Sequence, residues 1–366
     1  MPTSPNLTER LRERIEHEGP ITFYEWMKAA LYDERDGYYC RGDRVPQGRE
    51  GDYRTAPEVS SLFAAAFAEY IAGLYTELKR PRSWTVLEVG SGSGQFAHGF
   101  LSHLSEHLPE VYDATHYVIS EVGAAARSRT SHRLSAFSDR ISFQNFDEIT
   151  ETLNPGIIFS NELIDAFPVH RVSMREGKLR ELCVGASDKG FKWTECELEP
   201  EVAAYCRRVK MQLEEGQIAE VNLEAEEFVT RAAALLERGY LITVDYGAER
   251  EELWHSPARR LGTLRSFYRH QFIDDVLARP GEQDLTATID WSQIREAGER
   301  AGLRTIRHER LDQFLQSANI LGMMMLMTSK MHDSVGALRL TTSARELILP
   351  IGLAASFQVL VQEKVV

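Results

Sequence analysis

The stretch 87–96, LEVGSGSGQF, limits the fold of this chain more than any other part of its sequence. An apolar run, WTVLEV at 84–89, ends at three alternate glycines, Gly90, Gly92 and Gly94. A helical pattern with apolar residues on one face follows from 95 to 108. A buried strand, a glycine turn and a helix in this order predict one unit of a parallel α/β sheet.

The alternation of strands and helices continues along the chain. Further strands are predicted at 116–120, 141–145, 156–160, 240–245, 303–311 and 357–365, and a helix at about 223–238. The stretch 169–198 instead alternates polar and apolar residues, which predicts an inserted antiparallel meander. Continuous apolar strands separated by helices indicate a parallel sheet covered on both faces, whose ligand binds outside the carboxyl ends of the strands.

The spacing of the glycines indicates which nucleotide the turn binds. A dinucleotide fingerprint is GxGxxG, whereas the turn here reads GxGxG and follows Glu88. This spacing suits an adenosyl group with a carboxylate-bearing tail better than a pyrophosphate, and it disfavours a nicotinamide dehydrogenase. The sequence has no GxxxxGK[ST], HExxH or GxSxG motif, which argues against phosphotransfer, zinc-hydrolase and serine-hydrolase chemistry.

Acidic residues after the next two strands are candidates for contacts with the nucleotide. Glu121 follows the strand 116–120, and we expect it to bind the ribose hydroxyls. An exposed strand-end glutamate without a ligand is the alternative. Asp147 follows the strand 141–145, where an adenine amino group would lie, and Glu148 is an equal competitor for that contact.

A group of acidic and amide side chains follows the strand 156–160. The motif SNELIDAFPV (160–169) brings Asn161, Glu162 and Asp165 to the mouth of the predicted site. Paired carboxylates can bind a guanidinium by bidentate hydrogen bonds and favour loss of its proton during methyl transfer. The alternative is a helix N-terminus whose acids interact favourably with the helix dipole. Asp245 and His270 are further candidates for proton transfer, although His270 is equally compatible with a plain surface position.

The net charge and the cysteine spacing argue against a nucleic-acid partner and a bound metal ion. Acidic residues outnumber basic ones by 55 to 42, for a formal charge of −13 over 366 residues. This balance argues against a nucleic-acid partner; it is compatible with a basic protein partner, but solubility alone accounts for it more simply. The four cysteines show no metal spacing, so no metal ion is predicted.

Targeting and membrane signals are also absent from the sequence. No apolar run reaches the roughly 20 residues that cross a bilayer, and the longest, 320–327, predicts a core or groove helix. The first 20 residues lack the apolar segment of a secretory signal, so we expect an exposed helix there and a cytoplasmic protein.

Six motifs, in this order, resemble the MidA-type family of S-adenosylmethionine-dependent methyltransferases. They are GDYRTAPEVS (51–60), LEVGSGSG (87–94), SNELIDAFPV (160–169), DYG (245–247), GTLRSFYRH (262–270) and PGEQDLTATIDW (280–291). The resemblance covers nearly the whole chain from about residue 21. It implies an α/β, Rossmann-like class I fold with a seven-stranded, mostly parallel sheet. It also implies an N-terminal helical lid region (1–82) and a core (83–366) with insertions at 169–222 and 309–355.

The resemblance also implies a cofactor, a partner and a site. The cofactor would be S-adenosylmethionine, bound by residues of the glycine turn, the strand ends and the lid: Gly90, Gly92, Gly94, Glu121, Asp147, Asn161, Asp52, Thr55 and Glu58. Mitochondrial members of the family are complex I assembly factors that methylate an arginine of a core subunit. We therefore expect a protein substrate with an exposed arginine held by Glu162 and Asp165, no nucleic-acid or membrane partner, and a surface compatible with a homodimer. A cofactor-binding scaffold without transfer activity is the competing hypothesis.

Overall fold

The computed structural model describes residues 5–42, 56–188, 190–269, 271–331, 333–349 and 352–364. Three residues of the predicted site, Asp52, Thr55 and His270, lie outside these ranges.

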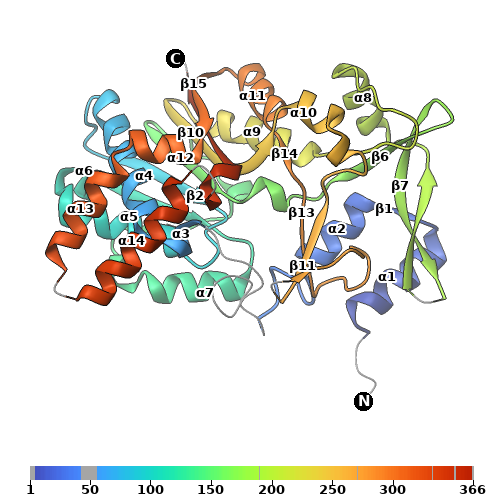
Figure 1. The fold of residues 1–366 in the computed structure, drawn as a ribbon, viewed down its shortest axis with the longest axis horizontal. Coiled ribbons are helices and arrows are strands. Elements are labelled where there is room, and N and C mark those ends of the chain that lie inside the picture. The colour runs from blue at the N-terminus through green and yellow to red at the C-terminus, as the bar shows by residue number, and fades with distance from the viewer. Residues whose placement is uncertain are drawn as a thin grey trace.

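A twisted central sheet forms the core of the protein (Figure 1). Its strands are, in spatial order, β15 (Leu303–Arg310), β16 (Phe357–Lys364), β10 (Gly239–Ala248), β5 (Gly156–Asn161), β2 (Trp84–Val89), β3 (Thr115–Ser120) and β4 (Ile141–Phe143). Neighbours from β10 to β4 pair in parallel, whereas β16 runs antiparallel to both β10 and β15. A short strand, β14 (Ile289–Asp290), extends the end of β10. The predicted seven-stranded, mostly parallel sheet is confirmed.

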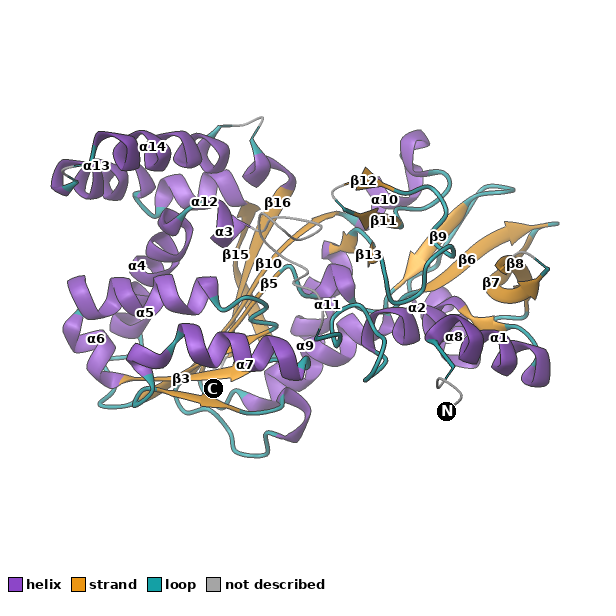
Figure 2. Cartoon of the chain, turned by 90° about the horizontal axis from the view of Figure 1, so that it is seen from below, coloured by secondary structure: helices purple, strands orange, loops and turns teal. Residues whose placement is uncertain are grey.

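The strands β2, β5 and β10 are buried over most of their length, because helices cover both faces of the sheet (Figure 2). Along β2, Val86 packs into the apolar cluster of the first face and Leu87 into that of the second. The helices of the first face are α3 (Ala56–Val59), α4 (Ser61–Glu77), α5 (Gln95–His107), α6 (Pro109–Ala114), α12 (Leu311–Ser317), α13 (Ile320–Lys330) and α14 (Ser334–Ile348), with the turn η5 (Leu353–Ser356). Those of the second face are α9 (Leu223–Leu235) and α11 (Trp291–Arg300). The segment between β3 and β4 holds α7 (Ala124–Arg133) and η1 (Ser135–Phe137), and η2 (Phe146–Glu148) follows β4.

A second, antiparallel sheet is inserted between β5 and α9 and lies at the opposite end of the molecule from α13 and α14 (Figure 1). Its strands are β1 (Ile21–Thr22), β7 (Lys178–Ser187), β6 (His170–Arg175) and β9 (Ile218–Val221), with β8 (Gly190–Cys196) also paired to β7. Strands β6, β7 and β8 form the predicted meander. The helices α1 (Leu7–Glu18) and α2 (Phe23–Tyr32) contact this sheet, and α8 (Pro200–Arg208) follows β8.

The region 1–82, predicted as one lid, contributes to both halves of the molecule. The helices α1 and α2 share an apolar cluster with the inserted sheet, whereas α4 packs against α5 on the central sheet. The domain boundary at residue 82 stays a prediction.

A small ribbon lies between the two sheets (Figure 2). It consists of β12 (Gln271–Phe272), β11 (Arg265–Tyr268) and β13 (Asp284–Thr286), and all of its pairs are antiparallel. The segment before it contains α10 (Arg250–His255) and η4 (Pro257–Arg259). The turn η3 (Ile164–Ala166), which follows β5, contacts both β10 and β13.

The apolar stretch 320–327, predicted as a core or groove helix, is helical, and only part of it lies in the core. Within α13 only Ile320 and Met323 are buried, whereas Met325 is 67% and Leu326 50% exposed. The helix packs with one side on α4, α12 and α14, and its exposed side chains lie on the other side. None of the helices in the described ranges combines the length and the apolar character needed to cross a membrane.

Candidate active site

The carboxyl ends of four parallel strands meet at one edge of the central sheet. They bring together Gly90 after β2, Glu121 after β3, Glu162 after β5, and Asp245 near the end of β10. Motifs that are far apart in the sequence therefore border one site.

The glycine turn after β2 has a backbone that other residues adopt only with strain. Gly90, Gly92 and Gly94 have φ values of 78°, 53° and 71°, which lie in the left-handed region that glycine enters freely. A Cβ atom at Gly90 would lie 2.8 Å from a methyl carbon of Leu163, and one at Gly94 would lie 2.7 Å from Thr130. The turn thus packs tightly against its neighbours and leads directly into α5.

Glu121 lies against this turn from the end of β3. Its carboxylate accepts hydrogen bonds from the backbone N–H of Gly92, at 2.8 Å, and of Gly123, at 3.2 Å. Burial raises the pKa of Glu121, and these backbone donors partly oppose the rise. A half-buried acid beside a glycine turn at adjacent strand ends fits the ribose of an adenosyl group, since its oxygens can accept from both hydroxyls.

The end of β4 contributes less to the site. The Asp147 side chain is 82% exposed, and its Oδ1 lies 3.8 Å from Nε of Arg231 on α9. The backbone there is fixed, because the Ser120 hydroxyl accepts from the Phe146 N–H at 2.9 Å. A contact between Asp147 and adenine stays a prediction.

Glu162 follows β5 in an unusual backbone conformation. Its φ of 50° is left-handed, and its N–H donates to the Val244 carbonyl at 2.9 Å. The carboxylate accepts from the Ala56 N–H of α3 at 3.3 Å and from Nδ2 of Asn161 at 3.1 Å. Burial, reinforced by the charge of Asp165, raises the pKa of Glu162 to about 8. A residue with a strained backbone that carries a half-buried acid with a raised pKa is typical of a functional site.

Asp165 is the second buried carboxylate of this motif, and it is 6% exposed. Burial raises its pKa to about 6, although the nearby Tyr246 hydroxyl and Arg265 guanidinium lower it. Among the described residues, nothing donates a hydrogen bond to its Oδ1, and the same holds for Oδ1 of Asn161. These two acceptor atoms therefore leave room for a donor from outside the chain.

Asp245 holds the backbone that carries Asp165. Its Oδ2 accepts from the N–H groups of Ile164, at 3.1 Å, and Asp165, at 3.3 Å, and its Oδ1 accepts from the Tyr246 N–H at 2.8 Å. Burial, together with the charge of Asp165, raises the pKa of Asp245 well above its usual value. A direct part for Asp245 in proton transfer stays a prediction.

Two residues beside Asp165 were not predicted as site residues. The Arg265 guanidinium lies 4.6 Å from the centre of the Tyr246 ring. The two side chains belong to the DYG and GTLRSFYRH motifs, which gave the signal that could have found them. Glu58 of α3, which was predicted, acts on the same acids, because its charge contributes to the raised pKa of Glu162.

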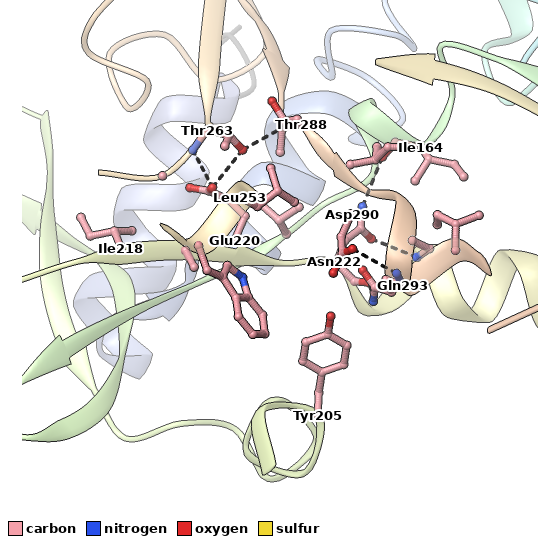
Figure 3. Close-up of a pocket in the computed structure, with 18 residues that line it drawn as sticks. Ile164, Tyr205, Ile218, Glu220, Asn222, Leu253, Thr263, Thr288, Asp290 and Gln293 are labelled. Atoms are coloured by element: carbon pink, nitrogen blue, oxygen red, sulfur yellow. Dashed lines mark hydrogen bonds between the residues drawn. The ribbon is translucent and has the colours of Figure 1, made fainter. Parts of the chain in front are cut away.

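A separate cavity lies behind η3, between the inserted sheet and the helices α9 and α11 (Figure 3). Its water-accessible space is about 30 Å³. Its polar side chains already have partners, since Glu220 accepts from the Thr263 N–H at 2.7 Å and Asp290 from the Gln293 N–H at 3.1 Å. The cavity lies at the junction between the two sheets. The site at the carboxyl ends of the parallel strands remains the candidate active site.

The topology and the strand-end site define a class of protein. A sheet with one antiparallel strand next to its edge, a glycine turn after the inner strand β2 and a half-buried acid after the neighbouring strand β3 make this a Rossmann-like, adenosyl-binding methyltransferase fold. The chain belongs to the family described as putative S-adenosyl-L-methionine-dependent methyltransferases, whose model matches residues 66–308. S-adenosylmethionine is therefore its cofactor, and the resemblance to the MidA-type family is confirmed.

Curated relatives agree with this assignment. The chain is 26% identical to a mitochondrial protein arginine methyltransferase NDUFAF7 homolog of Drosophila melanogaster, over 81% of this chain and 71% of that protein. It is 24% identical to the mitochondrial protein arginine methyltransferase NDUFAF7 of Homo sapiens, over 80% of this chain and 69% of the relative.

A solved structure is similar over almost the whole chain. It is a likely methyl transferase of the COG1565 superfamily from Burkholderia thailandensis, bound to S-adenosyl-homocysteine. The two chains are 29% identical and superpose with a TM-score of 0.85, over 98% of this chain and 91% of the other.

The relatives overturn one expectation from the sequence. The cytoplasmic location is contradicted, because these curated relatives are mitochondrial proteins.

Within the described parts of the chain, no group of three or more His, Cys, Asp or Glu side chains is arranged to hold a metal ion.

Proposed function

We propose that this protein methylates an arginine side chain of a partner protein. The observation that carries the proposal is the pair of carboxylates after β5, the half-buried Glu162 and the buried Asp165, which lies at the same end of the strands as the glycine turn. Both acids have raised pKa values, about 8 and about 6, mainly because they are buried. A cation bound between them would offset that burial and favour the ionised form of each acid.

The chemistry of a guanidinium suits this pair better than that of an ammonium. A guanidinium presents five N–H donors in one plane, whereas an ammonium is a compact point charge. The acceptors available to it include Oδ1 of Asp165 and Oδ1 of Asn161, which lack donors among the described residues. The names of the curated relatives, protein arginine methyltransferases, support the same acceptor.

The cofactor supplies a methyl group on a positively charged sulfur. In the proposed reaction a guanidinium nitrogen forms the new N–C bond as the S–C bond breaks, and one proton leaves that nitrogen. Glu162 would accept this proton and pass it to solvent, while Asp165 keeps its charge and holds the rest of the guanidinium. Gly90, Gly92, Gly94 and Glu121 would hold the cofactor.

A methyl-transfer assay with amino-acid analysis tests the proposal. Purified protein, radiolabelled S-adenosylmethionine and a lysate from methylation-inhibited cells should give label in a protein band, and hydrolysis should recover it as methylarginine. Glu162→Gln should lower the labelling by about 10²-fold or more, since it removes the proposed base. Glu237→Gln is the matched control, because Glu237 is exposed and bonds Asn154 rather than any residue of the site.

Two results would contradict the proposal. Label recovered in another amino acid would show a different acceptor. No label, with S-adenosyl-homocysteine binding intact in calorimetry, would favour the scaffold hypothesis.

A further inference from the structure

The ribbon of β11 and β13 lies against the turn that carries Asp165. The Ala287 N–H, just after β13, donates to the Asp165 carbonyl at 2.9 Å. Arg265 and Thr286 are direct cross-strand partners in this ribbon, so their side chains lie on one face. The ribbon therefore brings an arginine to the acceptor acids, and no function proposed above uses that arginine.

Aromatic contacts hold the Arg265 guanidinium in place. It lies 4.6 Å from the centre of the Tyr246 ring, and that ring contacts Phe357 of β16 edge-on at 5.7 Å. No carboxylate of the described ranges forms an ion pair with Arg265 within 4.0 Å. Its buried Nε also lacks a hydrogen-bond partner among the described residues. Among the described residues, no carboxylate therefore cancels the charge of Arg265 by direct contact.

The charge of Arg265 acts on Asp165. Burial raises the pKa of Asp165, and Tyr246 and Arg265 are the groups outside its own turn that lower it. The other titratable groups around these acids come from five elements: Glu162 after β5, Asp245 on β10, Glu58 on α3, Tyr32 on α2 and Asp284 on β13. Four of these five are acids, and any negative charge that they carry would raise the pKa of Asp165, whereas Arg265 lowers it.

We propose that Arg265 is a positioning residue which, stacked on Tyr246, keeps the Asp165 carboxylate negatively charged and fixed for a cationic acceptor. The proposal deepens the function proposed above and rests on it for the identity of that acceptor. The two carboxylates then have different roles: Asp165 stays negatively charged and anchors the cation, and Glu162 accepts a proton.

The protonation of Asp165 can be measured without any acceptor. In protein with ¹³C-labelled aspartate carboxyls, Asp165→Asn identifies the Asp165 signal by its loss. In Arg265→Gln the titration midpoint of that signal should rise by about one pH unit, because the opposing charge is gone. Arg265→Lys, which keeps the charge and serves as the conservative variant, should shift it by less.

Two further variants make the result specific. Tyr246→Phe keeps the ring under Arg265 and removes the hydroxyl, so it separates the two groups that act on Asp165. Arg140→Gln is the matched control, since Arg140 also stacks on a ring, that of Tyr112 at 5.3 Å, but next to the opposite ends of the strands. An unchanged midpoint in both Arg265→Gln and Arg265→Lys would overturn the proposal.

A binding measurement separates this proposal from the proposed function. Calorimetry of the complex with S-adenosyl-homocysteine should detect N-acetyl-arginine amide at pH 7, and Arg265→Gln should weaken that binding about twofold, because the ionised fraction of Asp165 would fall to about half. If wild-type protein binds butylamine but not the arginine amide, this result would contradict an arginine acceptor. The proposed role of Arg265 would then be judged by the titration of Asp165. Equal binding of the arginine amide by wild type and Arg265→Gln would count against Arg265 alone.

Discussion

At the scale of single residues, the buried acids decide how this protein responds to pH. Glu88, within β2, is 3% exposed, and its carboxylate accepts from the Tyr117 hydroxyl at 2.9 Å. Burial raises the pKa of Glu88 from 4.5 to about 8. Between these two pH values the folded state therefore keeps a proton that the unfolded chain releases. The contribution of protonated Glu88 to the free energy of unfolding is fully present below about pH 4.5 and is lost as the pH rises through about 8.

Glu88→Gln should remove that loss. Glutamine keeps an acceptor for the Tyr117 hydroxyl and has no charge to bury. The free energy of unfolding of the variant, relative to that of wild type, should therefore rise by about 3 to 5 kcal/mol between pH 5 and pH 8.5. Denaturant unfolding of the cofactor-free protein at both pH values measures the difference. Parallel pH profiles for the two proteins would show that Glu88 is ionised when folded.

The raised pKa of Glu162 predicts the pH dependence of transfer. A protonated Glu162 neither attracts a cation nor accepts a proton, so kcat/KM should rise with pH through about 8 in the free enzyme. Glu162→Gln should be slow and should lack this rise, whereas Glu237→Gln should keep it. A wild-type profile that is flat from pH 6 to pH 9 would mean that another group accepts the proton.

At the scale of elements, one aromatic side chain joins four of them. Phe67 of α4 contacts Phe96 of α5, Phe159 of β5 and Phe314 of α12, with ring centres 6.1, 5.3 and 4.8 Å apart. Phe67→Ala should lower the free energy of unfolding by about 3 to 5 kcal/mol, because it leaves a cavity in a fully buried layer. Phe272→Ala is the control, since Phe272 is 56% exposed and should change stability by about 0.5 kcal/mol or less. Denaturant unfolding at one pH compares the two, and equal losses would mean that the layer can collapse around the cavity.

The elements of the sheet were predictable because each buried strand is marked by its own residues. Continuous apolar runs such as 84–89 bury both faces, and the glycines fix the turn after them. The exposure of α13 was not predictable, since an apolar run does not reveal whether another element covers it. For the same reason, the acids of the site could be predicted as a group but not by role. Two features form only when β10, η3 and β11 have come together. They are the hydrogen bonds from three backbone N–H groups to the Asp245 carboxylate and the contact of Arg265 with Tyr246.

At the scale of the whole molecule, the cofactor should stabilise the fold by mass action. S-adenosyl-homocysteine at 100 times its Kd should raise the free energy of unfolding by about 2.7 kcal/mol. NAD at the same concentration should have no effect, which would distinguish the methyltransferase from a dehydrogenase. Gly94→Val should abolish the shift, since a side chain there would meet Thr130. Thermal unfolding with each ligand measures this, and stabilisation by NAD would contradict the cofactor assignment.

The pairing of β1 with β7 has a consequence for synthesis of the chain on the ribosome. Ile21 pairs with Val184, so the strand that receives β1 is translated more than 160 residues later. At about 5 to 20 residues per second this delay is roughly 10 to 30 s. During that time the apolar faces of α1 and α2, with Phe23 and Trp26, have no partner from the inserted sheet. We therefore expect chaperones that shield apolar segments to bind the nascent chain at α1 and α2 until the inserted sheet has been synthesised.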